Sequence, residues 1–171
     1  MNFNSLDELK SEGFLGFKQI RDLFLDTSTI PKERGNYLVL YVGGGRPEFD
    51  EKGVGGCFKG KKPYDLIEKL ESMWVGNTIV IYIGQAGGIR AGKWSNQTLN
   101  DRICTYMKFG QGQNVAHRGG RYVWQIKNYK DLIICWKPWP NKISDPKQVE
   151  GKLIQQFKSI YGKGPFANLQ D

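Results

Sequence analysis

Two short apolar runs constrain the fold of this chain more than any other feature. Residues 36–42 read NYLVLYV and residues 78–83 read TIVIYI. Both are rich in β-branched and aromatic residues and are bordered by glycine, which is typical of strands. Residues 121–126 and 131–136 have a similar character between polar turns. The sequence therefore predicts a sheet of a few strands, with 78–83 at its centre because that run is the most apolar.

Helical patterns separate the predicted strands. Residues 5–26 place apolar side chains at helical spacing, and Gly13 and Gly16 are expected to interrupt the run. Three further helices are predicted at residues 63–74, 98–109 and 146–161. Strands with interspersed helices predict an α+β fold, in which helices pack on a small, largely antiparallel sheet.

Positive charge is concentrated in the middle of the chain. The net charge is +8, from 25 Lys and Arg against 17 Asp and Glu. Between residues 85 and 130 there are eight basic residues and one acidic residue, Asp101. Such a zone favours a polyanionic partner but does not distinguish DNA from RNA. The residues expected to contact nucleic acid are Arg90, Lys93, Lys108, Arg118 and Arg121.

Composition disfavours several classes of protein. The three cysteines are isolated and form no C-x-x-C pair, which indicates neither a disulfide framework nor a zinc site. No apolar run approaches the roughly 18–20 residues that span a bilayer, and the mean hydropathy is −0.51. The first residues lack the basic start and apolar stretch of a secretory signal. We therefore expect a cytoplasmic protein with no membrane partner.

Metal-assisted cleavage of a phosphodiester needs few chemical groups. A water must be aligned and lose a proton, a cation must offset charge on the phosphate oxygens, and a carboxylate must hold a divalent ion. Because Mg²⁺ keeps several of its waters, one protein carboxylate can suffice. Residues of these types occur in order: GNY at 35–37, YIG at 82–84, Arg102 in LNDRICTY, Glu150 in the last helix and Asn168 in PFANL.

This order resembles the GIY-YIG nuclease family, which includes the nuclease domain of the bacterial excision-repair C subunit, intron homing endonucleases and some restriction enzymes. The strings YIGQAG, LNDRICTYMKFGQG and PFANL are similar to those of small bacterial proteins of that family. The resemblance covers residues 35–171 and implies one domain over that range. Residues 1–34 are then expected to form an N-terminal helical extension of a single compact unit.

The resemblance implies a role for each matching residue. Tyr37 and Tyr82 would lie on adjacent strands near the reactive phosphate, where one of them would align or deprotonate the attacking water. Arg102 would stabilise charge on the phosphate. Glu150 would bind a single Mg²⁺ or Mn²⁺ ion, and Asn168 would support the phosphate site.

Parts of the chain depart from the family pattern. A long segment separates the two tyrosine motifs where the family has a short hairpin, so residues of about 43–77 are expected to be an insertion. The segment before Arg102 is also longer, which leaves Arg90 as a rival for the phosphate-binding arginine. Gly84, after the second tyrosine, is expected to keep a side chain out of the substrate path.

Structural roles would also account for several of these residues. Glu150 is expected in the first turn of its helix, where the macrodipole favours an acid. Arg102 directly follows Asp101, and the two could form an ion pair at the surface. His117 is the only histidine, and a structural or surface role is favoured over that of a base.

Three functions stay open from the sequence. The leading hypothesis is a metal-dependent endonuclease acting on DNA, with RNA as an open alternative substrate. The second is a nucleic-acid-binding module of the same fold without turnover. The third is a protein-interaction or small-ligand domain that uses the glycine-rich segment 43–60 as its surface. The oligomeric state is not determined by the sequence.

Overall fold

The fold is α+β, and its centre is one antiparallel sheet of four strands in the order β1-β6-β2-β3. The computed structural model describes residues 1–117, 119–140 and 143–169. A separate small hairpin pairs β4 with β5. The strands are β1 (Leu15–Gln19), β2 (Gly35–Leu40), β3 (Val80–Ala86), β4 (Ile89–Arg90), β5 (Lys93–Trp94) and β6 (Ile133–Pro138).

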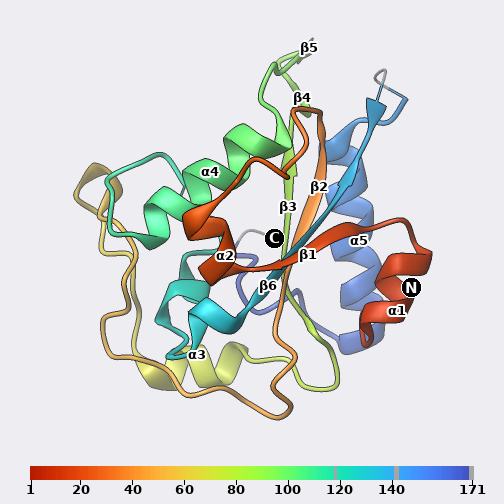
Figure 1. Cartoon of the computed structure of the whole chain (residues 1–171). Coiled ribbons are helices and arrows are strands. Elements are labelled where there is room, and N and C mark those ends of the chain that lie inside the picture. The colour runs from red at the N-terminus through yellow and green to blue at the C-terminus, as the bar shows by residue number, and fades with distance from the viewer. Residues whose placement is uncertain (118, 141–142, 170–171) are drawn as a thin grey trace.

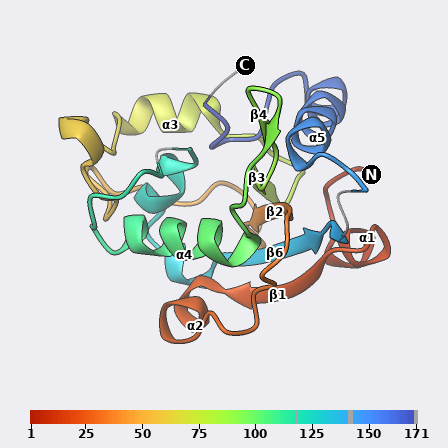
Figure 2. The ribbon, with the colours of Figure 1, turned by 90° about the horizontal axis from the view of Figure 1, so that it is seen from above.

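Helices cover both faces of the sheet. Viewed along the edge of the sheet, α4 and α5 lie on opposite sides of it (Figure 1). From above, α2 shares the side of α4, and α1 shares the side of α5 (Figure 2). The helices are α1 (Leu6–Ser11), α2 (Ile20–Leu25), α3 (Ile67–Met73), α4 (Leu99–Gly110) and α5 (Pro146–Tyr161), with 3-10 turns η1 (Phe58–Gly60), η2 (Arg121–Gln125) and η3 (Tyr129–Asp131).

The central strand β2 is buried along its whole length. Its side chains alternate between two hydrophobic cores, as the two-residue period of a strand requires. Tyr37 belongs to the core under α4, together with Ile103. Leu38 belongs to the core under α5, together with Phe157. The sheet is therefore the middle of three layers.

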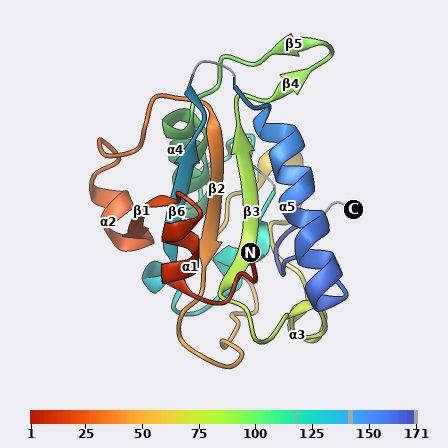
Figure 3. The same cartoon turned by 90° about the vertical axis from the view of Figure 1, so that its right-hand side faces the viewer.

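The run at 78–83 forms β3 as predicted, but its expected central position is wrong. β3 lies at the edge of the sheet, and β2 and β6 are central. The apolar character of β3 has a different cause, since α4 and α5 both pack on it (Figure 3). Its outer backbone edge is also covered, because the amide of Ala167 donates to the carbonyl of Ile81 at 2.8 Å. A covered edge is protected against pairing with another chain.

The N-terminal segment differs from the expected broken helix. A strand, β1, follows α1 and pairs with β6, so residues 1–34 extend the sheet instead of forming a purely helical extension. Gly16 has φ of +91°, and a Cβ there would lie 2.4 Å from the ring of Trp136. This glycine allows β1 to pass over the Trp136 ring. In the sequence it was expected to interrupt a helix, and in the structure it lies at the start of a strand.

Residues 121–126 were expected to form a strand, and this is wrong, because they form the 3-10 turn η2. Tyr122, Val123 and Trp124 are all buried within this turn. The backbone of the turn bonds to the insertion instead of a sheet. The carbonyl of Gln125 accepts from the amide of Asp50 at 2.7 Å, and its side-chain amide donates to the carbonyls of Asp50 and Asp65.

The later helices agree with the sequence pattern. α4 has a capping box between Thr98 and Asp101, and α5 has Asp145 as its N-cap and Pro146 in its first turn. The helix predicted from residue 63 begins later, at Ile67. No helix in the described ranges is long and apolar enough to cross a bilayer.

Candidate active site

An open groove of about 1050 Å³ lies between α4, α5 and the outer edge of β3. Six basic side chains and one acidic side chain line it. The polar residues of its wall are Lys61, Tyr82, Gln85, Arg90, Arg102, Arg121, Lys147, Glu150, Gln155, Lys158 and Asn168. This excess of positive charge in a concave surface favours an anionic ligand.

The five residues predicted to be catalytic gather at this groove. Tyr82, Arg102, Glu150 and Asn168 line its wall. Tyr37 is completely buried beneath them, with its ring centroid 5.9 Å from that of Tyr82. The long insertion does not separate the two tyrosines, because β2 and β3 pair directly. Of the two phenols, Tyr82 is the one that faces the groove, because Tyr37 is completely buried.

The predicted nucleic-acid contacts are only partly at the groove. Arg90 and Arg121 line it. Lys93 and Lys108 are exposed and are not part of its wall. Arg118 lies outside the described residues.

Three lysines of the groove were missed by the sequence reasoning. Lys61 comes from the insertion, and Lys147 and Lys158 come from α5. Residues 147, 150/151, 154 and 158 follow helical spacing, so they share the face of α5 that carries Glu150. That spacing is the signal that could have identified the two α5 lysines.

Glycines make room for the tyrosine rings. A Cβ on Gly84 would lie 2.4 Å from Cζ of Tyr37, and one on Gly119 would lie 2.8 Å from the hydroxyl of Tyr82. Gly84 was expected to clear a path for the substrate. The structure gives it another purpose, which is to accommodate the Tyr37 ring against β3.

Arg102 has no ion pair with its neighbour Asp101. The carboxylate of Asp101 instead accepts from the backbone amide and the hydroxyl of Thr98, at 2.9 and 2.7 Å. Nε of Arg102 is buried and has no hydrogen-bond partner within the described part of the chain. A buried donor of this kind is costly unless a ligand accepts from it, so Arg102 suits an anion in the groove.

Glu150 lies beyond the first turn of α5, which contains no acidic residue. The macrodipole therefore does not account for it. The side chain is half-buried. Burial raises its pKa to about 7, against the opposing effect of the positive charges on Arg102, Lys147 and Arg90. A cation bound at Glu150 would favour its ionised form.

Glu150 is the carboxylate of the groove wall that could hold a hard divalent cation. Among the described residues there is no group of three or more His, Cys, Asp or Glu side chains that could enclose a metal ion. Mg²⁺ is usually held by one or two carboxylates, its own waters and a substrate phosphate, and Glu150 in an open groove matches that requirement.

Asn36, the middle residue of GNY, was not identified from the sequence as important. It is completely buried. Its Nδ2 donates to the carbonyl of Pro146 at 2.8 Å, and its Oδ1 accepts from Nε1 of Trp139 at 2.8 Å. Pro146 begins α5, so Asn36 fixes the start of the helix that carries Glu150 relative to β2.

Asn168 lines the groove, but its amide is engaged with β3. Oδ1 accepts from the amide of Ile83 at 2.9 Å, and Nδ2 donates to the carbonyl of the same residue at 2.8 Å. The side chain thus pairs with the edge of β3 as another strand would. Its contribution to the site is to hold that edge in place next to Tyr82.

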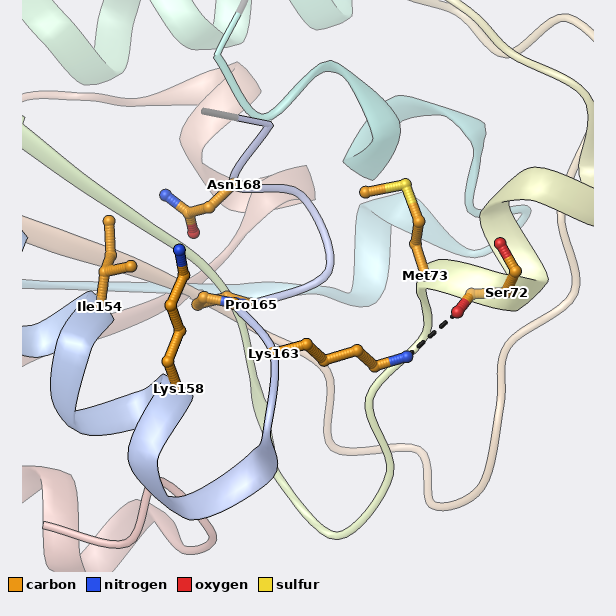
Figure 4. A pocket seen from close by; sticks show the side chains of 8 residues that line it. Ser72, Met73, Ile154, Lys158, Lys163, Pro165 and Asn168 are labelled. Atoms are coloured by element: carbon orange, nitrogen blue, oxygen red, sulfur yellow. Dashed lines mark hydrogen bonds between the residues drawn. The ribbon is translucent and has the colours of Figure 1, made fainter. Parts of the chain in front are cut away.

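A smaller pocket of about 240 Å³ adjoins the groove. The two share Ile154, Lys158 and Asn168. Figure 4 shows Lys158 extending from α5 toward Asn168, and Lys163 donating to the carbonyl of Ser72, a bond of 3.0 Å. Positive charge therefore continues beyond Glu150 toward the end of α5.

The phenols at the site are neutral near pH 7. Burial raises the pKa of both Tyr37 and Tyr82, and the positive charge of Arg102 opposes this only in part. Behind them, the hydroxyl of Tyr37 is bonded to Nε2 of His117 at 3.1 Å. His117 is completely buried, so the sequence alternative of a surface role is wrong.

Comparison of the chain with protein-family models, curated proteins and solved structures found no match. The function is therefore inferred from the residues of the groove.

Proposed function

We propose that this chain is a metal-dependent endonuclease of the GIY-YIG type that hydrolyses phosphodiester bonds in DNA. The observation that carries the proposal is the convergence of Tyr82, Arg102 and Glu150 on a single groove. A phenol, a buried guanidinium and a lone carboxylate are the groups that metal-assisted phosphodiester hydrolysis needs. The six basic side chains of the wall support a polyanionic substrate.

Each group has a distinct task in this proposal. Arg102 donates to the non-bridging phosphate oxygens as their negative charge grows. Glu150 holds the divalent ion, which supplies Lewis-acid stabilisation of the phosphate when bound. Tyr82 faces the groove and positions the attacking water through its hydroxyl. Asn36 and Asn168 keep α5 and the edge of β3 in register around these groups.

Cleavage of plasmid and branched DNA with Mg²⁺ or Mn²⁺ tests the proposal, with RNA of the same sequence as a parallel substrate. Glu150→Gln and Arg102→Ala are each expected to lower kcat by about 100-fold or more, because each removes stabilisation of the transition state. Glu12→Gln is the matched control, since Glu12 is an exposed carboxylate that does not line the groove. The proposal fails if the wild-type protein binds DNA but cleaves no member of the substrate panel.

The basic wall also favours a second candidate, a nucleic-acid-binding module without turnover. Charge complementarity alone is enough to bind a phosphate backbone. In that case the Kd for DNA falls steeply with decreasing salt, Glu150→Gln leaves it unchanged, and no cleavage product forms. A protein that binds no nucleic acid at low salt would contradict both candidates and favour the protein-interaction or small-ligand role.

A further inference from the structure

The small hairpin formed by β4 and β5 lies at the border of the groove. Figures 1 and 3 show it projecting beyond the sheet, past the N-terminal end of α5. Arg90 and Ala91 of this hairpin line the same groove as Arg102 and Glu150. A ligand phosphate at Arg102 and Glu150 would therefore have the hairpin beside it.

The backbone gives the hairpin a defined shape. Arg90 lies directly opposite Lys93, so the loop between the two strands has only two residues. These residues, Ala91 and Gly92, have φ of +48° and +75°, and two consecutive positive φ values are those of a type I′ turn. Such a turn matches the right-handed twist of the strands that it joins. The tip is therefore a narrow two-stranded ribbon and not an open loop.

The base of the hairpin is fixed to the body of the protein. The amide of Ile89 donates to Oδ1 of Asp145, the N-cap of α5, at 3.1 Å. On the other strand, the guanidinium of Arg34 lies 5.3 Å from the ring centroid of Trp94. Nε of Arg34 also donates to the carbonyl of Ser95 at 3.3 Å. These contacts hold the ribbon in one direction relative to α5.

The two faces of the ribbon differ in charge. Cross-strand partners point to the same face, so Arg90 and Lys93 share one face, and the contact of Trp94 with the body lies on the other. Arg90 and Lys93 are exposed, and neither forms an ion pair with another residue of the described ranges. Like charges directly opposite each other destabilise paired strands. A polyanion against this face would relieve the repulsion.

The dimensions of the ribbon fit one kind of nucleic-acid surface. Neighbouring strands lie about 4.8 Å apart before their side chains are counted. The major groove of B-form DNA is about 12 Å wide and admits a two-stranded ribbon, whereas the minor groove is only about 6 Å wide. In A-form RNA the major groove is too deep and narrow for side chains to read. A single strand has no groove of either kind.

We propose that the β4–β5 hairpin enters the major groove of duplex DNA beside the phosphate bound at Arg102 and Glu150. This inference rests on the proposed function, and it gives the hairpin a contact with the duplex that the catalytic groups do not make. Arg90 and Lys93 donate to acceptors on the base edges or on the flanking phosphates. Ala91 and Gly92, which have no long side chains, keep the tip narrow.

Equilibrium binding in EDTA tests the shape of the ribbon without turnover. Gly92→Val places a β-branched residue at a positive φ and disturbs the turn, although a Cβ there meets nothing within 4 Å. We expect the Kd for a short DNA duplex to rise about 10-fold, with a change below about 2-fold for the single strand and for duplex RNA of the same sequence. Gly44→Val is the matched control, because Gly44 also has a positive φ and an open Cβ position but does not line the groove.

A second variant changes the charge of the ribbon and keeps its turn. Lys93→Gln should raise the Kd for duplex DNA by about 5-fold, because a contact with the polyanion is lost. Lys108→Gln is its control, since Lys108 is an exposed lysine of α4 that does not line the groove.

A modified duplex tests which DNA groove the ribbon enters. Glucosylated hydroxymethylcytosine in place of cytosine fills the major groove with sugar. The wild-type protein should bind this duplex about 10-fold more weakly than the unmodified one, because the ribbon is excluded. Gly92→Val should bind the two duplexes equally.

The outcomes separate the ribbon from the chemistry beside it. A protein that binds duplex DNA, loses that affinity in Gly92→Val and cleaves nothing supports the ribbon and overturns the nuclease function. A protein that cleaves DNA, with Gly92→Val and Lys93→Gln at wild-type Kd, overturns the ribbon and leaves the nuclease function standing. Losses of equal size for duplex DNA, duplex RNA and the single strand, or in Gly44→Val, also overturn the ribbon. So does a wild-type protein that binds no duplex DNA.

Discussion

The ionisation of Glu150 has a direct consequence for stability. Its pKa in the folded protein is raised from an ordinary 4.5 to about 7. A group with a raised pKa favours the folded state fully below its unfolded pKa, and this contribution is lost as pH rises through the folded value. The folded protein therefore carries an unfavourable carboxylate at pH 8 but a protonated, neutral group at pH 5.

Glu150→Gln should accordingly stabilise the protein at pH 8 by about 1–2 kcal/mol, after allowance for its partial exposure to solvent. The difference from wild type should shrink at pH 5. Urea unfolding at the two pH values, without divalent ions, measures this. Glu12→Gln, at an exposed carboxylate that does not line the groove, is the matched control. Equal stabilisation of Glu150→Gln at both pH values would contradict the raised pKa.

Two glycines near the groove should respond to alanine with opposite signs. Gly84→Ala places a Cβ against the Tyr37 ring, and we expect a loss of about 1–3 kcal/mol from overpacking. Gly151 lies in α5, where an added Cβ meets nothing within 4 Å, so alanine should add about 0.5–1 kcal/mol through helix propensity. Thermal and urea unfolding of both variants provide the comparison, and a stabilised Gly84→Ala would refute the close packing of Tyr37.

At the residue scale, the order of the motifs along the chain identified residues of the candidate site that residue type alone would not have singled out. Tyr82, Arg102 and Glu150 line the same groove. They could be placed from the sequence because the strand and the helices that carry them have clear sequence signals. The structural roles of Asn36 and His117 could not be predicted from the sequence. Their importance depends on partners distant in sequence, the carbonyl of Pro146 and the hydroxyl of Tyr37, which no local pattern encodes.

At the scale of elements, the junction between β2 and α5 depends on Asn36. Its removal leaves Nε1 of Trp139 and the carbonyl of Pro146 without their partner. We expect Asn36→Ala to cost roughly 2 kcal/mol, the price of buried polar groups left unsatisfied. The start of α5 should also loosen, which should weaken the Mg²⁺ binding proposed for Glu150.

Unfolding by urea and titration with Mg²⁺ measure these two effects of Asn36→Ala. Asn128→Ala is the matched control, because Asn128 is exposed and does not line the groove. A variant with lower stability but wild-type Mg²⁺ affinity would show that Asn36 supports the fold without positioning Glu150.

The strand errors at this scale have a common origin. Propensity identified β2, β3 and β6, whose apolar runs are buried in the sheet. It failed at β1, where the residues have helical spacing but Gly16 lets the strand pass over the ring of Trp136. It also failed at η2, whose backbone forms hydrogen bonds with the insertion. Both depend on tertiary partners, which override local preference.

At the scale of the whole molecule, the groove is assembled from distant parts of the chain. Lys61 comes from the insertion, Arg102 from α4 and Lys147 from α5. The concentration of charge between residues 85 and 130 predicted a polyanion partner but not this surface. Three of the six basic groove residues lie outside that segment. Only the folded arrangement brings the charges of the insertion and α5 to the groove.

The contribution of groove charge to the proposed binding of DNA can be tested within one helix. Lys147 and Lys152 are both exposed lysines of α5, but only Lys147 lines the groove. We expect Lys147→Gln to weaken DNA binding and to lower the slope of log Kd against log salt concentration by about 1, because one phosphate contact is lost. Lys152→Gln should leave the slope unchanged. The two variants remove the same charge from the same helix, so equal effects would indicate that net charge, and not the groove, attracts DNA.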